Sequence, residues 1–133
     1  MSLIVDASVA VKWVVDEPDS DKALALYQNE RDLAAPTLIV AEVGNTLWKK
    51  CRRKLVTERQ MTFALEALPR FLSHLCELPE LASRAGELAV RLDHPIYDCF
   101  YLALAQRESS AIVTADERLF AAARKARIRA RRL

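Results

Sequence analysis

The sequence predicts an α/β fold, a three-layer α/β/α sandwich around a mostly parallel central sheet. Short apolar segments, partly β-branched, alternate along the chain with longer segments whose apolar residues recur at helical spacing. This alternation is typical of a parallel sheet covered by helices on both faces, joined by right-handed crossovers. The 133 residues suffice for one domain and are too few for two, so we expect a single domain over residues 1–133.

The first half of the chain contains two predicted strands and four predicted helices. Residues 2–5 are short, apolar and partly β-branched, as expected of a strand. Pro36 is expected to open a helix, because the first helical turn tolerates proline well. The predicted strands are residues 2–5 and 33–35, and the predicted helices are residues 8–15, 19–30, 36–53 and 57–72.

The second half repeats the alternation with three predicted strands and three predicted helices. The segment 96–107 is a helix that is apolar almost all round, which indicates burial. The predicted strands are residues 74–78, 111–114 and 128–132, and the predicted helices are residues 80–92, 96–107 and 116–126.

Composition excludes several kinds of protein. Gly44 and Gly86 are the two glycines of the chain, so neither a P-loop nor a glycine-rich dinucleotide site is available. Three widely spaced cysteines support neither a disulfide framework nor a zinc site. No apolar run reaches the roughly 18 residues that span a bilayer, so we expect a cytoplasmic protein without a membrane partner.

The charge is unevenly distributed, although the net charge is only +2. The last 16 residues contain seven basic residues and no acid, whereas residues 1–117 contain 13 basic and 18 acidic residues. A second basic cluster, KKCRRK, occupies residues 49–54. This asymmetry indicates a polyanionic partner, and a solvated basic surface is the alternative.

Four acidic residues occupy unusual positions. Asp6 and Asp116 directly follow predicted parallel strands, whose carboxyl ends meet at one edge of a sheet. Glu42 lies one to two turns into its helix, with Asn45 three residues later on the same polar stripe. Asp98 is the only charge between Ile96 and Ala105, where an unpaired buried carboxylate would be costly.

Each acid also has a purely structural interpretation. Asp6 or Ser8 would cap the helix that follows, and Asp98 would suit the positive end of a helix dipole. Thr114 and Glu117 have the spacing of a capping box, which would leave Asp116 an ordinary first-turn acid. The four acids together, without a histidine or cysteine cluster, instead favour hard oxygen ligands for Mg²⁺ or Mn²⁺.

Four sequence blocks carry a family resemblance that covers nearly the whole chain. They are IVDASVAVKW, APTLIVAEVGNTLWK, HPIYDCFYLALAQ and AIVTADERL, in this order. In these blocks the sequence resembles PIN-domain proteins, specifically the VapC-type toxin ribonucleases. The resemblance implies a PIN-like α/β/α fold, endonucleolytic RNA cleavage dependent on Mg²⁺ or Mn²⁺, a homodimer, and a small antitoxin that masks the active site.

The resemblance also implies site residues. It makes Asp6, Glu42, Asp98 and Asp116 the acidic catalytic site and makes Ser8, Asn45 and Thr114 its polar neighbours. Within that site we assign Asp6, Asp98 and Asp116 to the metal, and Glu42 either to the attacking water or to a second metal site. The chain departs from some relatives in one respect, because Arg118 stands where they have a further acid, which weakens the case for a second metal.

Two other functions remain open at this point. The first is a PIN-like domain that binds nucleic acid or a protein partner without catalysis. The second is a phosphoryl-accepting receiver domain, although this sequence lacks adjacent acids after its first strand and a well-placed lysine after its last. We expect Trp13, Tyr97 and Tyr101 to serve core or dimer packing, with stacking on RNA bases as the alternative. We expect His74 and His94 to be isolated and non-catalytic.

Overall fold

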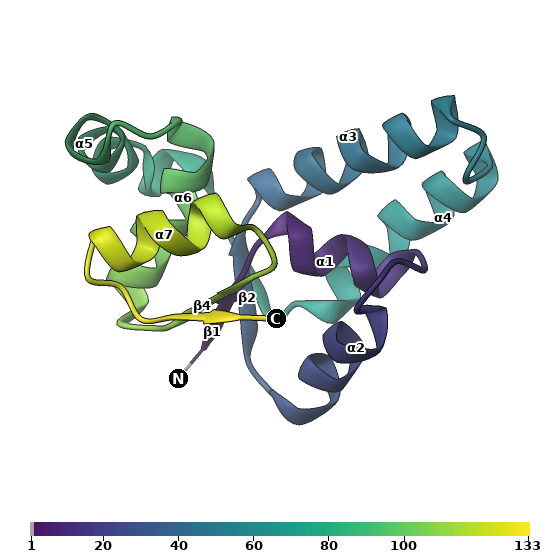
Figure 1. The fold of residues 1–133 in the computed structure, drawn as a ribbon, viewed down its shortest axis with the longest axis horizontal. Helices are drawn as coiled ribbons and strands as arrows, with labels where there is room; N and C mark the ends of the chain where they lie inside the picture. Colours follow the sequence, from purple (N-terminus) through teal and green to yellow (C-terminus); the bar gives the residue numbers. More distant parts are fainter. Residues whose placement is uncertain (1) are drawn as a thin grey trace.

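A five-stranded, all-parallel sheet forms the centre of the molecule (Figure 1). The structure is a computed structural model that describes residues 2–133. The strand order is β3-β2-β1-β4-β5. The strands are β1 (Leu3–Val5), β2 (Leu33–Pro36), β3 (His74–Cys76), β4 (Ile112–Thr114) and β5 (Ala130–Arg132). The predicted parallel sheet is therefore confirmed.

Helices cover both faces of this sheet, as Figure 1 shows. The helices that follow β1 and β2 lie on one face, and the helices that follow β3 and β4 lie on the other. The first group is α1 (Ala7–Val14), α2 (Ser20–Asn29), α3 (Leu38–Arg52) and α4 (Glu58–Ala67). The second group is α5 (Ala82–Leu92), α6 (Ile96–Glu108) and α7 (Glu117–Lys125). The three-layer α/β/α architecture is confirmed.

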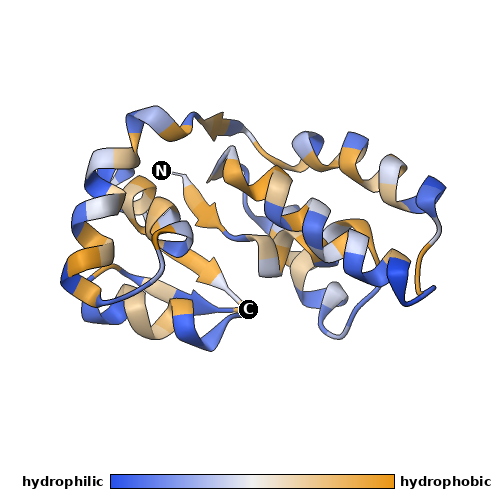
Figure 2. Ribbon diagram, turned by 90° about the horizontal axis from the view of Figure 1, so that it is seen from above, coloured by the Kyte–Doolittle hydropathy of each residue, from blue (hydrophilic) through white to orange (hydrophobic). Residues whose placement is uncertain are grey.

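The core lies between the sheet and these helices. All three residues of β1 are buried, and the inner strands are coloured hydrophobic in Figure 2. The all-round apolar helix α6 packs against β1, β2 and β4, and Tyr101, Leu102 and Leu104 are almost fully buried there. Burial of α6 explains why it lacks the polar face of a surface helix. Among residues 2–133, no helix combines the length and apolarity needed to cross a membrane.

The strand order reverses between β1 and β4, which creates the crevice that matters for function. From β1 the chain continues outward to β2 and β3, whereas β4 and β5 lie on the opposite side of β1. Val5 and Val113 are in register, so the two strands end side by side. In open α/β sheets, binding sites form outside the carboxyl ends of the strands at such a reversal.

Three prolines explain most of the differences from the predicted elements. Pro36 ends β2 instead of opening a helix. It is paired with Cys76 on β3, whereas the pairing of β2 with β1 stops at Ala34. Proline has no backbone N–H, and none is needed there for a hydrogen bond to β1. Pro69 ends α4 early and lies in a 3₁₀ turn, Leu68–Phe71. Pro79 similarly shortens the predicted strand 74–78 and lies in the 3₁₀ turn Leu78–Glu80.

Candidate active site

A pocket of about 700 Å³ opens at the carboxyl edge of the sheet, and all four predicted acids line it. Asp6 follows β1, Glu42 lies on α3, Asp98 lies in the first turn of α6, and Asp116 precedes α7. The four side chains come from segments up to 110 residues apart and from both helical layers. The structure therefore brings the four predicted acids to one pocket, and their catalytic and metal-binding roles stay predictions.

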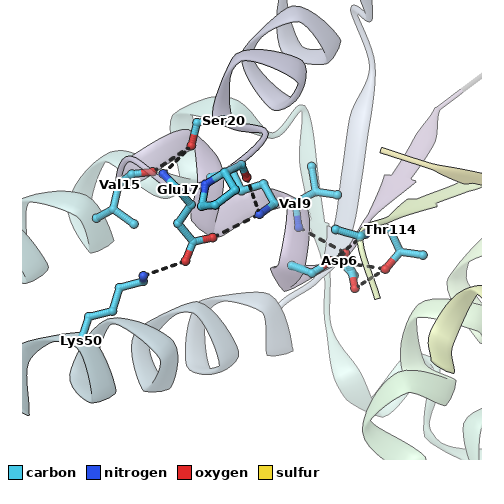
Figure 3. Close-up of polar contacts among 11 residues, drawn as sticks. Asp6, Val9, Val15, Glu17, Ser20, Lys50 and Thr114 are labelled. Atoms are coloured by element: carbon cyan, nitrogen blue, oxygen red, sulfur yellow. Dashed lines mark hydrogen bonds and ion pairs between the residues drawn. The ribbon is translucent and has the colours of Figure 1, made fainter. Parts of the chain in front are cut away.

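Asp6 is the most buried of the four acids, with 6% of its surface exposed. Its carboxylate accepts hydrogen bonds from the hydroxyls of Ser8 and Thr114, both at 2.7 Å. Figure 3 shows Thr114 beside Asp6. Burial raises the pKa of Asp6 to about 6, and the charge of Asp116 adds to this rise. The two hydroxyl donors oppose the rise but do not cancel it.

Ser8 and Thr114 join the ends of β1 and β4 around this carboxylate. The fully buried Thr114 hydroxyl donates to Asp6 and accepts from the backbone N–H of Asp116 at 2.9 Å. Ser8 accepts from the N–H of Ala115 at 2.9 Å and lines the pocket. Both residues are therefore polar neighbours of the acids, as predicted, and they fix the positions of two of them.

The capping interpretations hold together with the shared pocket. Asp6 caps α1 by accepting from the N–H of Val9 at 3.4 Å, and Asp116 caps α7 by accepting from Arg118 and Leu119 at 2.8 and 3.2 Å. A carboxylate at a helix start has four lone-pair sites, so it can cap the helix and still face the pocket.

The proposed capping box of Thr114 and Glu117 is wrong. The N-cap of α7 is Asp116, and the Thr114 hydroxyl accepts from the N–H of Asp116, not from that of Glu117. Glu117 is exposed and pairs with Arg132 at 2.7 and 3.1 Å, and it is not among the residues that line the pocket. Glu117 therefore does not replace the further acid that is missing at Arg118.

Glu42 has a partner that the sequence interpretation missed. The hydroxyl of Tyr101 donates to Glu42 Oε1 at 2.6 Å, although we expected this tyrosine only to pack in the core or a dimer. Burial raises the pKa of Glu42, and the charges of Asp98 and Asp116 raise it further, whereas the Tyr101 hydrogen bond lowers it. No local pattern relates residues 42 and 101, because they belong to helices on opposite faces of the sheet.

Asp98 is paired with His94, which corrects the prediction that His94 is isolated. His94 Nε2 lies 2.6 Å from Asp98 Oδ2, and the two side chains are 11% and 27% exposed. The i,i+4 spacing was a usable signal, since residues four apart meet on a helical face. The partner that a carboxylate in this apolar helix requires is therefore a histidine.

A three-residue ion network borders the pocket on the α1 side. Glu17 pairs with Lys12 at 3.3 Å and with Lys50 at 2.8 Å, and Figure 3 shows Lys50 reaching Glu17 from α3. Burial works to raise the pKa of Glu17, but the two lysines outweigh it and hold that pKa below its usual value. Among the described residues that line the pocket, Lys12 is the basic one.

The remaining predicted neighbours and aromatics fall into two groups. Asn45 lines the pocket, as predicted, and so does the 60% exposed Tyr97, which is not a core residue. Trp13 is buried as expected: it stacks on Phe71 with ring centroids 5.2 Å apart and donates to the carbonyl of Ala23 at 2.8 Å.

The donor set of the pocket fits a hard divalent cation. Its ligand candidates are carboxylate oxygens, which Mg²⁺ and Mn²⁺ prefer, and their mutual repulsion contributes to the raised pKa values of Asp6 and Glu42. A positive charge in the pocket would relieve that repulsion. Within residues 2–133, however, no three His, Cys, Asp or Glu side chains stand close enough together to hold an ion in their present positions.

Comparison with protein families gives one extended match. The sequence model of the PIN domain matches residues 3–125. Two curated relatives are similar over 121 residues, or 90% of this chain: Ribonuclease VapC3 of Pyrobaculum aerophilum at 33% identity and Ribonuclease VapC1 of Mycobacterium tuberculosis at 32%. These alignments cover 92% and 89% of the two relatives.

Solved structures share the fold. PAE2754 from Pyrobaculum aerophilum is 26% identical and superposes with a TM-score of 0.72, over 92% of this chain and 79% of that one. Mycobacterium tuberculosis VapC20, described as a sarcin-ricin loop cleaving toxin, gives 0.73 at 18% identity over 90% and 94%. VapBC2 from Rickettsia felis, bound to a DNA fragment from its promoter, gives 0.70 at 17% identity over 100% and 99%. At such low identities the last two likenesses concern the fold alone.

Proposed function

Because this chain belongs to the PIN-domain family, we infer that it is a VapC-type ribonuclease, the toxin of a VapBC-type toxin–antitoxin system. The observation that carries this inference is the convergence of Asp6, Glu42, Asp98 and Asp116 in one pocket at the strand reversal. The substrate is RNA, and the reaction is hydrolysis of a phosphodiester bond. The likeness to curated ribonucleases over 90% of the chain supports the reaction class independently of the pocket.

Asp6, Asp98 and Asp116 would hold Mg²⁺ or Mn²⁺, directly or through water. When bound, the ion neutralises the phosphate and lowers the pKa of a coordinated water. The Ser8 and Thr114 hydroxyls keep the Asp6 carboxylate in one orientation at the base of the pocket. His94 occupies Oδ2 of Asp98, which leaves Oδ1 free to face the pocket.

Glu42 orients the attacking water and accepts its proton. It lines the pocket from α3, on a different helical layer from Asp98. Burial and neighbouring acids raise its pKa, which brings a general base closer to neutral pH and makes it a better proton acceptor. Lys12 and the exposed Tyr97, which also line the pocket, are positioned to contact the RNA beside the reacting phosphate.

A small antitoxin is the proposed protein partner, and it masks this pocket. Carboxylates that repel one another are a ready binding site for an arginine side chain, which pairs with them bidentately. The fold that this chain shares with VapBC2 of Rickettsia felis is consistent with such a partner. We further propose that the toxin is a homodimer, which sedimentation of the purified chain would test.

The alternatives are less well supported. Receiver domains of the flavodoxin-like class have the strand order 2-1-3-4-5, whereas this sheet has 3-2-1-4-5. A binding domain without catalysis would not require four acids from four separate segments around one pocket.

The deciding experiment compares two Asp→Asn variants of the purified, partner-free protein. Asp98→Asn should slow metal-dependent RNA cleavage by more than about 100-fold, since losing even an outer-sphere partner of a metal costs about 10- to 100-fold. Cleavage by the wild type should require Mg²⁺ or Mn²⁺ and stop with EDTA. Sequencing the ends of the cut RNA would identify the substrate site.

Asp93→Asn is the matched control for this experiment. It removes the same charge five residues away, at an exposed left-handed position (φ 50°) that asparagine tolerates well. This variant should cleave RNA at the wild-type rate. Wild-type cleavage by Asp98→Asn would show that Asp98 takes no part in the reaction.

A further inference from the structure

We propose that Tyr101 is a positioning residue of the reaction, whose hydroxyl holds the Glu42 carboxylate in the pocket across the edge of the sheet. The inference deepens the proposed ribonuclease function and rests on it. It assigns a role to a buried tyrosine that local sequence pattern marks only as core.

The first observation is geometric. Tyr101 is 1% exposed and lies on α6, which packs against β1, β2 and β4. Its ring therefore cannot move without disturbing the core, and the hydroxyl is a fixed point. The oxygen-to-oxygen distance of 2.6 Å to Glu42 Oε1 is that of a charge-assisted hydrogen bond.

The second observation concerns Glu42. It lies on α3, between the exposed residues Ala41 and Asn45, on the part of the helix that faces the pocket. A half-buried glutamate there has three side-chain torsions, and fixing them carries an entropic penalty. The rigid Tyr101 hydroxyl opposes this freedom and leaves Oε2 available to a water.

The direction of the hydrogen bond is determined by the chemistry of the two groups. Burial raises the pKa of Tyr101 well above its usual value, so the phenol keeps its proton and donates. Glu42 accepts. The bond connects α3 and α6, which cover opposite faces of the sheet, so it fixes Glu42 relative to Asp98 on the same helix as Tyr101.

A purely structural interpretation makes a different prediction. A buried tyrosine normally needs some partner for its hydroxyl, and Glu42 would then simply satisfy the tyrosine. In that case Tyr101→Phe would lower stability and leave the catalytic rate of the folded protein unchanged. A positioning role instead predicts a loss of rate that depends on residue 42.

The test is a double-mutant cycle in single-turnover cleavage at saturating Mg²⁺ and excess enzyme. Tyr101→Phe should lower the maximal rate by about 10- to 100-fold, the size expected when a catalytic group moves by about 1 Å, with the enzyme concentration at half-maximal rate changed less than about twofold. In the Glu42→Gln background the same change should have little further effect. Tyr27→Phe, which removes a hydroxyl outside the pocket, is the control and should match the wild type.

Three outcomes would overturn the proposal: a wild-type maximal rate for Tyr101→Phe, equal slowing in the wild-type and Glu42→Gln backgrounds, or additive shifts of the urea midpoints. The same four proteins are also unfolded in urea, where the midpoint shifts of the two single variants should fail to add. If the wild type cuts no RNA, the proposed ribonuclease function fails. The urea midpoints then still test the coupling between Tyr101 and Glu42, because additive shifts would show that the two side chains do not interact. Non-additive shifts with an active wild type and a slowed Tyr101→Phe support it.

Discussion

At the scale of single residues, Asp6 shows a conflict between function and stability. Its carboxylate is buried beside other acids and has no cationic partner among the described residues, so its charged form is disfavoured in the folded protein. The two hydroxyl hydrogen bonds reduce this penalty. Residues at functional sites often retain such an unfavourable charge because the reaction requires it.

Asp6→Asn is therefore expected to stabilise the protein while abolishing cleavage. Neutral asparagine avoids the penalty on the buried charge, and the Thr114 hydroxyl can accept from its amide. With EDTA at pH 7.5, we expect the free energy of unfolding to rise by about 1 to 3 kcal/mol, the scale of a pKa shift of roughly two units. Urea denaturation monitored by circular dichroism would measure it.

The pH dependence of this difference has a definite sign. The pKa of Asp6 is about 6 in the folded protein and 3.8 in the reference state, so the folded protein binds the extra proton between these values. The wild type therefore gains stability from this group as the pH falls through 6, and the advantage of Asp6→Asn should shrink and vanish below about pH 4. A wild type more stable than the variant at pH 7.5 in EDTA would contradict this account.

At the scale of elements, the acids lie on helices or at helix starts, and the ends of the strands determine where those helices begin. β1 and β4 end in register, and their next residues, Asp6 and the Ala115–Asp116 turn, face the pocket. Each strand is only three residues long, so the short strands place the helix starts directly at the crevice. Because capping and pocket formation use the same carboxylates, the positions of α1 and α7 are coupled to the site.

Helix α5 contains a glycine that the structure does not require. A Cβ built at Gly86 would have no heavy atom within 4 Å, and its φ is not positive. Gly86→Ala should therefore stabilise the protein by about 0.5 to 1 kcal/mol, the helix-propensity difference between the two residues. Thermal unfolding would measure the gain, and RNA cleavage should be unchanged because α5 does not line the pocket.

Gly44→Ala on α3 is the comparison. Its Cβ would meet the Leu65 side chain at 3.6 Å, an ordinary contact, so a similar gain is expected. Destabilisation by Gly86→Ala would mean that the open space beside α5 is occupied in solution, for example by a second subunit.

At the scale of the whole molecule, charge is divided between the pocket and the surface. Five carboxylates line the pocket, and only Glu17 among them is paired with lysines. Arg131 and Arg132, at the end of the chain, already pair with Glu30 and Glu117 at 3.6 and 2.7 Å. Arg132 also lies 4.0 Å from the Phe120 ring centroid. Part of the basic C-terminal segment therefore stabilises the β5 edge. Fewer of its basic residues are left to bind a polyanionic partner than the sequence suggests.

The acidic pocket predicts how the antitoxin acts. Adding the partner to the toxin should reduce cleavage in proportion to the complex formed, and changing the arginine that enters the pocket to alanine should weaken the inhibition. The inhibition should also weaken at high salt, since part of the attraction is screened. Tight binding of the partner with undiminished cleavage would rule out direct masking of the pocket.

The sequence by itself determined the order of the elements and the edge of the sheet on which the acids lie. Hydrophobic periodicity is local, so it identifies strands and helices, and the geometry of parallel strands then brings Asp6 and Asp116 together. The Asp98–His94 pair can also be predicted from sequence, since i,i+4 contacts follow from helix geometry alone.

Only the tertiary structure decided which distant groups touch. Tyr101 reaches Glu42, and Lys12 and Lys50 share Glu17, because helices from separate parts of the chain pack at particular rotations and heights. Pro36 lies in a strand because the register of its neighbours requires no donor there. Such contacts depend on how whole helices pack against the sheet, and the periodicity within one helix or strand carries no information about that packing.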